Sequence, residues 1–285
     1  MGWTFRISEH ARYQKEAWFI TLTYDQDNVP LLDNNTGEIV RGMDKNCQDR
    51  YETLDYQDLT TFINSVKKAQ NRAVREARSE SRSPGEAFND YVPSYYAVGE
   101  YGGQYGRPHY HIIMFNIWEN IAQETRLEKI WKKGRIETEA LNPALIHYAT
   151  GYIHEKSKYI RGKQVKPKMQ CSKGIGEQYV IRNKQFHKDN LNPWIWFNGY
   201  KIAMPDYYKD KIFTEEEKEA INKKIMEFHN VEDPRMETYV DKTRTRVEDK
   251  RLIFSESTTD VPRQTQEQAQ WEHSINYRSK KRNKL

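Results

Sequence analysis

Three apolar stretches of the chain predict buried β-strands. The first runs from Trp18 to Tyr24, reads WFITLTY and ends at the polar turn Asp25–Asn28. It is rich in β-branched and aromatic residues, as strands are. The other two, Ser94–Glu100 and His109–Asn116, are joined by a glycine-rich connection, which predicts an antiparallel hairpin. The residues after the first strand, as far as Asp49, indicate a polar loop.

Apolar residues at helical spacing separate these strands. From Asp55 to about Glu80 they recur every three or four positions, and Asp55 or Thr53 can cap that helix. Ile117–Lys132 predicts one amphipathic helix. Asn142-Pro143 begins another, which we expect to reach about Lys158, because proline is well tolerated in a first turn. Thr214–Asn230 predicts a helix capped by Thr214.

The pattern weakens toward the C-terminus. Glu177–Asn183 fits a short helix or a strand, and beyond Val231 apolar residues are sparse and the chain ends in a basic sequence. Strands and helices in this mixed order indicate an α+β fold with a central antiparallel sheet flanked by helices. We predict a main domain over residues 1–190. The C-terminal extension over residues 191–285 is expected to be helical and partly extended, with a mobile basic tail.

Composition narrows the class of protein. The chain has 285 residues, 31% of them charged, with 19 Tyr and 7 Trp, and so many aromatic residues exclude wholesale disorder. The formal net charge is +5, but residues 151–190 hold ten Lys or Arg against three Asp or Glu. A basic block with aromatic neighbours suits a nucleic-acid backbone and unpaired bases. A solvated lysine face explains that charge equally well.

Cysteine usage and hydropathy bear on the compartment. Cys47 and Cys171 lack the spacing of a zinc site and are too few for a disulfide framework. No apolar run approaches transmembrane length, and the first residues lack the apolar core of a signal peptide. We expect a soluble protein in a reducing cytoplasm, with no membrane partner.

The two histidines of His109-Tyr110-His111 are candidate metal ligands. Alternate side chains of a strand share a face, so His109 and His111 point the same way and Tyr110 points the other way. The predicted hairpin brings Glu100 beside them, and its carboxylate suits Mg²⁺ or Mn²⁺. Taken singly, each of these residues also fits an ordinary structural or surface role.

Two tyrosines are candidate nucleophiles. Tyr148, Tyr152 and Lys156 are spaced four apart, which places them in one stripe on a helix. A tyrosine hydroxyl can attack a phosphodiester and remain joined to the DNA as a phosphotyrosine ester. A lysine one turn along can hold the phosphate or lower the pKa of the hydroxyl. Two core aromatic residues at helical spacing are the alternative.

These motifs together resemble a known family. Gly99-Glu100-Tyr101-Gly102, followed by Gly106-Arg107-Pro108-His109-Tyr110-His111-Ile112, looks like the metal-binding motif of HUH endonucleases. It is especially similar to that of the replication initiators of small single-stranded DNA bacteriophages, the Microviridae and their gokushovirus branch. Further resemblances occur in the family's order, over roughly residues 18 to 180, at Phe19–Tyr24, Tyr148-x-x-x-Tyr152 with Lys156, and Lys173–Gly176.

The resemblance implies a fold and a mechanism. Residues 1–190 would form an HUH endonuclease domain with an RRM-like palm, in which Glu100, His109 and His111 hold Mg²⁺ or Mn²⁺. One tyrosine would nick single-stranded DNA at the phage replication origin and form a 5′-phosphotyrosine link, and the second would allow rejoining after a round of rolling-circle replication. A host DNA polymerase would extend the freed 3′ end. The setting would be the cytoplasm of the bacterial host.

Several basic and aromatic residues are candidate DNA contacts. Tyr24 and Trp194 are candidates for stacking on unpaired bases. The chain has no Gly-x-x-x-x-Gly-Lys-Ser/Thr loop, so a host helicase would have to unwind the duplex. The candidates for phosphate contacts are Arg107, Lys158, Arg161, Lys163 and Lys173.

Other functions fit parts of the pattern. A relaxase, a plasmid initiator or a transposase belongs to the same superfamily. A single-stranded DNA-binding protein without chemistry would use the basic block and keep the histidines as structural residues. A phosphoesterase that uses histidines directly would want a third alternating histidine, and position 113 is isoleucine.

Overall fold

The computed structural model describes residues 2–41, 50–80, 92–102, 106–155 and 164–229. The chain divides into two compact units between Glu177 and Gln178. This division comes before the boundary that the sequence predicts at residue 190, and the extent of an endonuclease domain stays a prediction.

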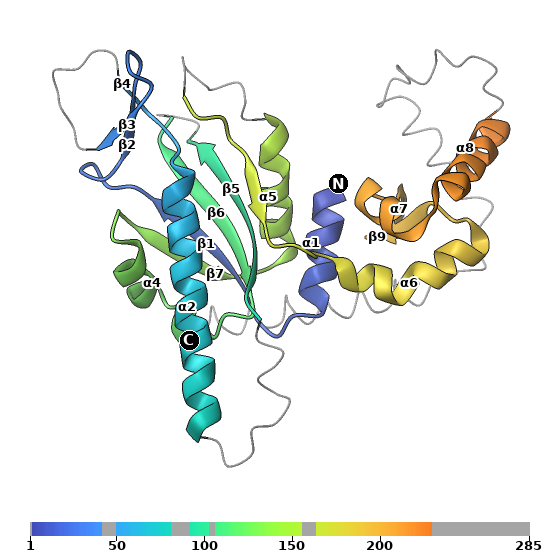
Figure 1. Cartoon of the computed structure of the whole chain (residues 1–285), viewed down its shortest axis with the longest axis horizontal. Helices are drawn as coiled ribbons and strands as arrows, with labels where there is room; N and C mark the ends of the chain where they lie inside the picture. The colour runs from blue at the N-terminus through green and yellow to red at the C-terminus, as the bar shows by residue number, and fades with distance from the viewer. Residues whose placement is uncertain (1, 42–49, 81–91, 103–105, 156–163, 230–285) are drawn as a thin grey trace. The chain divides into compact units, whose positions relative to one another are not determined.

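The first unit is built on a five-stranded antiparallel sheet (Figure 1). The predicted hairpin of the second and third apolar stretches is confirmed, and the first stretch pairs with it in the middle of the sheet. The strands lie in the order β7 (Ile136–Ala140), β1 (Ala17–Thr23), β6 (Pro108–Phe115), β5 (Ser94–Tyr101) and β8 (Met169–Cys171). The predicted α+β fold with a central antiparallel sheet is therefore confirmed.

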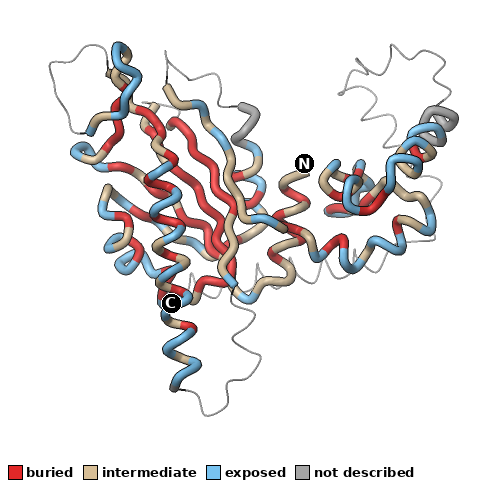
Figure 2. The backbone as a smooth tube through the Cα atoms, in the orientation of Figure 1, coloured by how far each residue is buried: buried red, intermediate tan, exposed pale blue. Residues whose placement is uncertain are grey.

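One face of this sheet carries the main hydrophobic core. The long helix α2 (Tyr56–Glu80) packs there with Leu59, Phe62 and Ile63, and α3 (Glu119–Ala122) and α4 (Glu124–Trp131) add to the same core. Figure 2 shows the strands behind α2 as buried. Asp55 caps α2 as predicted, because its Oδ1 accepts a hydrogen bond from the Gln57 amide at 2.9 Å.

The opposite face of the sheet is covered by α1 (Gly2–Arg12) and α5 (Pro143–Glu155). The two helices are joined by the hydroxyls of Thr4 and Thr150, which lie 2.8 Å apart. On this face the ring of His10 contacts Phe115 edge-on, with ring centroids 4.7 Å apart. α5 is the helix that the sequence predicted to begin at Asn142-Pro143, and it contacts β5 and β6, the two hairpin strands.

Some predicted elements differ in the structure. The helix predicted over Ile117–Lys132 is two helices, because Gln123 between them has extended backbone angles. Two strands of a second small antiparallel sheet lie in the predicted polar loop through Asp49, and the third follows it directly. These three- and four-residue strands are too short to give a periodic signal. Its strands are β3 (Ile39–Arg41), β2 (Pro30–Asp33) and β4 (Arg50–Glu52), in that order.

The second unit contains more regular structure than the sequence indicated. Glu177–Asn183 is helical and continues as α6 (Glu177–Asn190). A hairpin of β9 (Trp194–Phe197) and β10 (Tyr200–Ala203) follows, closed by Asn198-Gly199, both with positive φ, as a tight two-residue hairpin turn requires. The sequence did not predict this hairpin, nor α7 (Asp206–Ile212). The basic tail lies outside the described residues.

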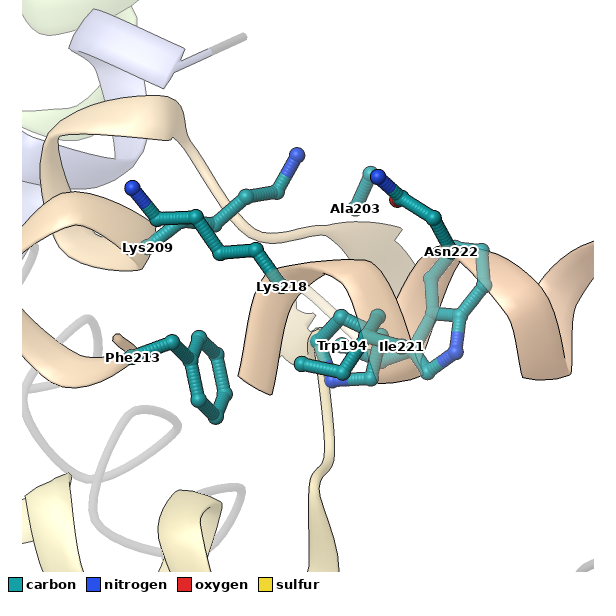
Figure 3. A pocket seen from close by; sticks show the side chains of 8 residues that line it. Trp194, Ala203, Lys209, Phe213, Lys218, Ile221 and Asn222 are labelled. Atoms are coloured by element: carbon teal, nitrogen blue, oxygen red, sulfur yellow. The ribbon is translucent and has the colours of Figure 1, made fainter. Parts of the chain in front are cut away.

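The last described helix, α8 (Glu215–His229), begins as predicted. Thr214 and Glu217 form a reciprocal cap, since each side chain accepts a hydrogen bond from the other's amide, at 3.3 and 2.8 Å. A hollow between this helix and the hairpin is lined by Trp194, Phe213 and Lys218, among others (Figure 3). Lys218 is paired with Asp210 and Glu215, at 2.8 Å each. In the part of the chain that the structure describes, no helix is long and apolar enough to cross a membrane.

Candidate metal centre and tyrosine nucleophile

Glu100, His109 and His111 meet at one end of the five-stranded sheet. Glu100 on β5 lies directly opposite His109 on β6, and His111 follows two residues later on the same face. His111 Nε2 lies 3.3 Å from Glu100 Oε1, and His109 Nε2 contacts the same oxygen. One ligand atom from each residue can be chosen so that all lie within 4.8 Å of one another. The structure therefore brings together the three predicted metal ligands.

In both histidines a neighbouring oxygen atom lies within hydrogen-bonding distance of Nδ1, the ring nitrogen that does not face Glu100. His109 Nδ1 lies 3.0 Å from the carbonyl oxygen of Arg107, which can only accept a hydrogen bond, so Nε2 is the ring nitrogen that is placed to bind a metal ion. His111 Nδ1 lies 3.1 Å from Thr21 Oγ1. The ring of Phe19 stacks on His111 with centroids 5.3 Å apart. Each Nε2 atom is thus directed at Glu100 and is available as a ligand.

These residues fit a divalent metal ion. Glu100 and His111 are only 2% and 5% exposed, and a carboxylate buried to this degree needs a cationic partner or strong hydrogen bonds. Two imidazole nitrogens and one carboxylate oxygen form a donor set that leaves coordination positions open for a substrate. The set does not by itself select one metal, since imidazole and carboxylate each suit several divalent ions.

Tyr148 lies beside this cluster. It comes from α5, its side chain is 38% exposed, and its hydroxyl lies 3.3 Å from His111 Nε2. Its ring meets the His111 imidazole edge-on, with centroids 4.9 Å apart. Tyr152 follows one turn later in the same helix, but its side chain lies outside the described part of the structure, as does all of Lys156.

Thr21 and Phe19 contact His111. The sequence placed them in the family-like stretch Phe19–Tyr24 but gave them no role at the metal site. They alternate along the first predicted strand, so their common face could be expected. Their proximity to His111 depends on the pairing of β1 with β6, in which Thr21 lies opposite His111. That register cannot be read from the spacing of residues along the chain.

The candidate DNA contacts lie in different places. Arg107 is beside the cluster and reaches Gln26 Oε1 at 3.4 Å. Lys173 is exposed, but it follows β8 at the opposite end of the sheet, where the Ser172 amide bonds to the carbonyl of Tyr95. The other three lie outside the described residues: Lys158, Arg161 and Lys163.

The prediction that Tyr24 stacks on a DNA base is wrong. Its side chain is 3% exposed, and its hydroxyl donates to Asp58 Oδ2 at 2.9 Å. Burial, together with Tyr110 and Asp58, raises the pKa of Tyr24 far above its usual range. Trp194 is partly exposed in the second unit, and its role in stacking stays a prediction.

The fold and this cluster agree with the resemblance drawn from the sequence. The antiparallel sheet is flanked by helices, and two histidines on a central strand lie beside a glutamate on the neighbouring strand, as the resemblance to HUH endonucleases implies. Residues 17–157 match the model of the family "Replication-associated protein ORF2/G2P". That segment includes every described member of the candidate site, and it belongs to this family of replication-associated proteins.

The curated relatives come from viruses and phages of bacteria. The chain is 28% identical to replication-associated protein ORF2 of Spiroplasma virus 4 over 200 residues, 64% of this chain and 53% of the relative. It is 26% identical to replication-associated protein ORF4 of Chlamydia phage 1, over 40% of this chain and 34% of the relative. For replication-associated protein VP4 of Bdellovibrio phage phiMH2K the identity is 23%, over 70% and 60%. The matches span about a third to three fifths of these relatives' lengths. The resemblance to phage replication proteins is thereby confirmed.

A solved structure is a much weaker match. The N-terminal nuclease domain of non-structural protein-1 of minute virus of mice aligns over 65% of this chain and 84% of that chain. The sequence identity is 12% and the TM-score is 0.19. At that score the likeness carries no argument about this protein.

Proposed function

We propose that this chain initiates rolling-circle replication by nicking single-stranded DNA at a phage origin. The observation that supports this best is the Tyr148 hydroxyl, which lies partly exposed and 3.3 Å from Nε2 of the candidate metal ligand His111. A nucleophile and a Lewis-acid site are the two components that a tyrosine-dependent nick requires. The match to replication-associated proteins of phages supports the same role.

In the proposed reaction the phenolic oxygen of Tyr148 attacks a phosphodiester. A new bond forms between this oxygen and phosphorus, and the bond from phosphorus to the 3′ oxygen breaks. The proton that the phenol loses is balanced by the proton that the 3′ hydroxyl gains, so the products are a 5′-phosphotyrosine and a free 3′ end. When bound by Glu100, His109 and His111, Mg²⁺ or Mn²⁺ would polarise the scissile phosphate.

The second half of the proposal concerns Tyr152 and the basic residues. Residues four apart on a helix share a face, so Tyr152 is proposed as a second nucleophile that cuts after one round and allows the strand to be rejoined. Lys156 is proposed to hold the phosphate, and the five candidate basic residues to contact the backbone. A host helicase and a host polymerase would act with the protein in the cytoplasm of the bacterial cell.

The test is the formation of a covalent adduct. The full chain is incubated with labelled single-stranded origin DNA and Mn²⁺ and analysed under denaturing conditions. We expect an adduct with the wild type, less with Tyr148→Phe or Tyr152→Phe, and none with the double variant. Tyr200→Phe is the matched control, since Tyr200 is an exposed tyrosine, at 58%, on the hairpin of the second unit.

Three outcomes would contradict the proposal. An undiminished adduct with the double variant would exclude both tyrosines as nucleophiles. DNA binding without any adduct would favour the non-catalytic binding protein. Cleavage that survives His109→Ala together with His111→Ala would exclude the proposed metal centre.

A further inference from the structure

Two residues next to the metal ligands are tyrosines whose side chains lie on the opposite face of the sheet. Tyr110 stands between His109 and His111 on β6, and Tyr101 follows Glu100 on β5. Strand alternation directs both tyrosines away from the ligands, into the core beneath α2. Both side chains are fully buried, at 0% exposed.

The two hydroxyls bind consecutive main-chain amides. The Tyr110 hydroxyl accepts a hydrogen bond from the Asp55 amide at 2.7 Å and donates to the Asp55 carbonyl at 2.8 Å. The Tyr101 hydroxyl accepts from the Leu54 amide at 3.1 Å and donates to the Val165 carbonyl at 2.8 Å. The short segment just before α2 is thus bonded to the strand of the histidines and to the strand of the glutamate.

Ring packing limits the freedom of Tyr110 further. Its ring lies against Tyr24, Tyr56 and Trp131, with centroids 6.0, 6.0 and 6.4 Å away. Its hydroxyl also lies 3.2 Å from that of Tyr24. A strand residue held at both its ring and its hydroxyl cannot rotate about the strand axis without breaking these contacts. The directions in which the side chains of His109 and His111 leave the strand are fixed with it.

We propose that Tyr101 and Tyr110 are positioning residues for the metal centre. By binding the adjacent amides of Leu54 and Asp55, they hold the carboxylate strand and the histidine strand at one separation and twist. The cluster is then assembled before a metal ion binds. This inference rests on the proposed function only in assuming that Glu100, His109 and His111 bind a divalent ion.

The test measures Mn²⁺ binding to the full chain by isothermal titration calorimetry, without DNA. Tyr110→Phe removes the hydroxyl and keeps the ring. We expect Mn²⁺ to bind about tenfold more weakly, as is typical when a group that orients a metal ligand is lost. Tyr101→Phe is expected to act in the same direction. His109→Ala with His111→Ala, which removes two ligands, should abolish binding.

Tyr56→Phe is the matched control. In the wild type, the Tyr56 hydroxyl donates to the Lys168 carbonyl at 3.0 Å and accepts from the Lys168 amide at 2.6 Å, much as the Tyr110 hydroxyl binds Asp55. Tyr56 lies on α2, however, and not on a strand that carries a metal ligand. It should lose stability to a similar degree as Tyr110→Phe and keep the wild-type Mn²⁺ affinity. Urea unfolding of each variant shows whether the stabilities match, so a general loss of structure can be told from mispositioned ligands.

Each outcome decides the matter. Wild-type affinity in both Tyr110→Phe and Tyr101→Phe, or equal weakening in Tyr56→Phe, would overturn the positioning role. If the wild type binds no Mn²⁺, both the metal centre and its positioning are overturned. A wild type that binds Mn²⁺ but does not nick DNA would overturn only the proposed function. Should Tyr110→Phe not fold, Tyr24→Phe replaces it, because it removes only the 3.2 Å contact to the Tyr110 hydroxyl and the bond to Asp58.

Discussion

Gly99 precedes the candidate ligand Glu100, and core side chains occupy the space that a side chain at position 99 would need. A Cβ at position 99 would lie 2.8 Å from the Tyr56 hydroxyl and 3.0 and 3.2 Å from the two methyl carbons of Leu54. Leu54 is fully buried, and the Tyr56 hydroxyl is held by two hydrogen bonds to Lys168. Neither neighbour can move away freely, so we expect Gly99→Ala to destabilise the protein.

The size of the effect follows from these contacts. Forcing an extra methyl group into a packed core costs about 1–3 kcal/mol, and displacing the Tyr56 hydroxyl from one of its bonds adds about 1 kcal/mol. Against this, alanine reduces the entropy of the unfolded chain, which stabilises by about 0.4–1 kcal/mol. The free energy of unfolding should therefore fall by about 1–3 kcal/mol.

Urea unfolding of a double-mutant cycle with Tyr56→Phe measures this. Removing the Tyr56 oxygen makes room for the methyl group, so Gly99→Ala should cost less in the Tyr56→Phe background than in the wild type. Gly151→Ala is the control: a Cβ there meets nothing within 4 Å, and an alanine inside α5 should stabilise by about 1 kcal/mol. A Gly99→Ala variant as stable as the wild type, or purely additive effects in the cycle, would refute the reasoning.

Two further predictions concern stability. Gly134→Ala should destabilise by at least about 3 kcal/mol, since its φ is +149° and a Cβ would lie 2.3 Å from the Thr23 carbonyl oxygen and 2.5 Å from the Asp25 amide; a thermal melt near that of the wild type would contradict this. Burial, then the charge of Arg6, lowers the pKa of His10 from 6.5 to about 4. The unfolded chain therefore takes up the proton first as the pH falls. As the pH falls from 6.5 to about 4, the free energy of unfolding of the wild type should decrease by about 3 kcal/mol through His10. The His10→Gln variant should not show this decrease. Urea unfolding across that range measures both proteins, and the same pH dependence in the two would contradict the prediction.

Much of the candidate site could be predicted because its signals are local. Alternation along a strand put His109 and His111 on one face, and the glycine-rich connection indicated the hairpin that carries Glu100. Helical spacing marked Tyr148, and its place on α5 agrees with that expectation. The prediction for Tyr24 failed because an aromatic residue at the end of a strand gives no sign of whether it is exposed or bonded to a buried carboxylate.

By itself, the sequence determined the three central strands, the helix after them on which Tyr148 lies, and the face that each histidine takes, because these depend on periodicities of two and of 3.6 residues. Only the tertiary structure decided that Glu100 pairs with His109, since a slip of one residue would move its carboxylate to the other face. It also decided that α5 brings the Tyr148 hydroxyl to His111. In the same way, it decided that the hydroxyls of Tyr101 and Tyr110 bind the main-chain amides just before α2. These relations join residues far apart in the chain, and no local pattern specifies how such segments pack.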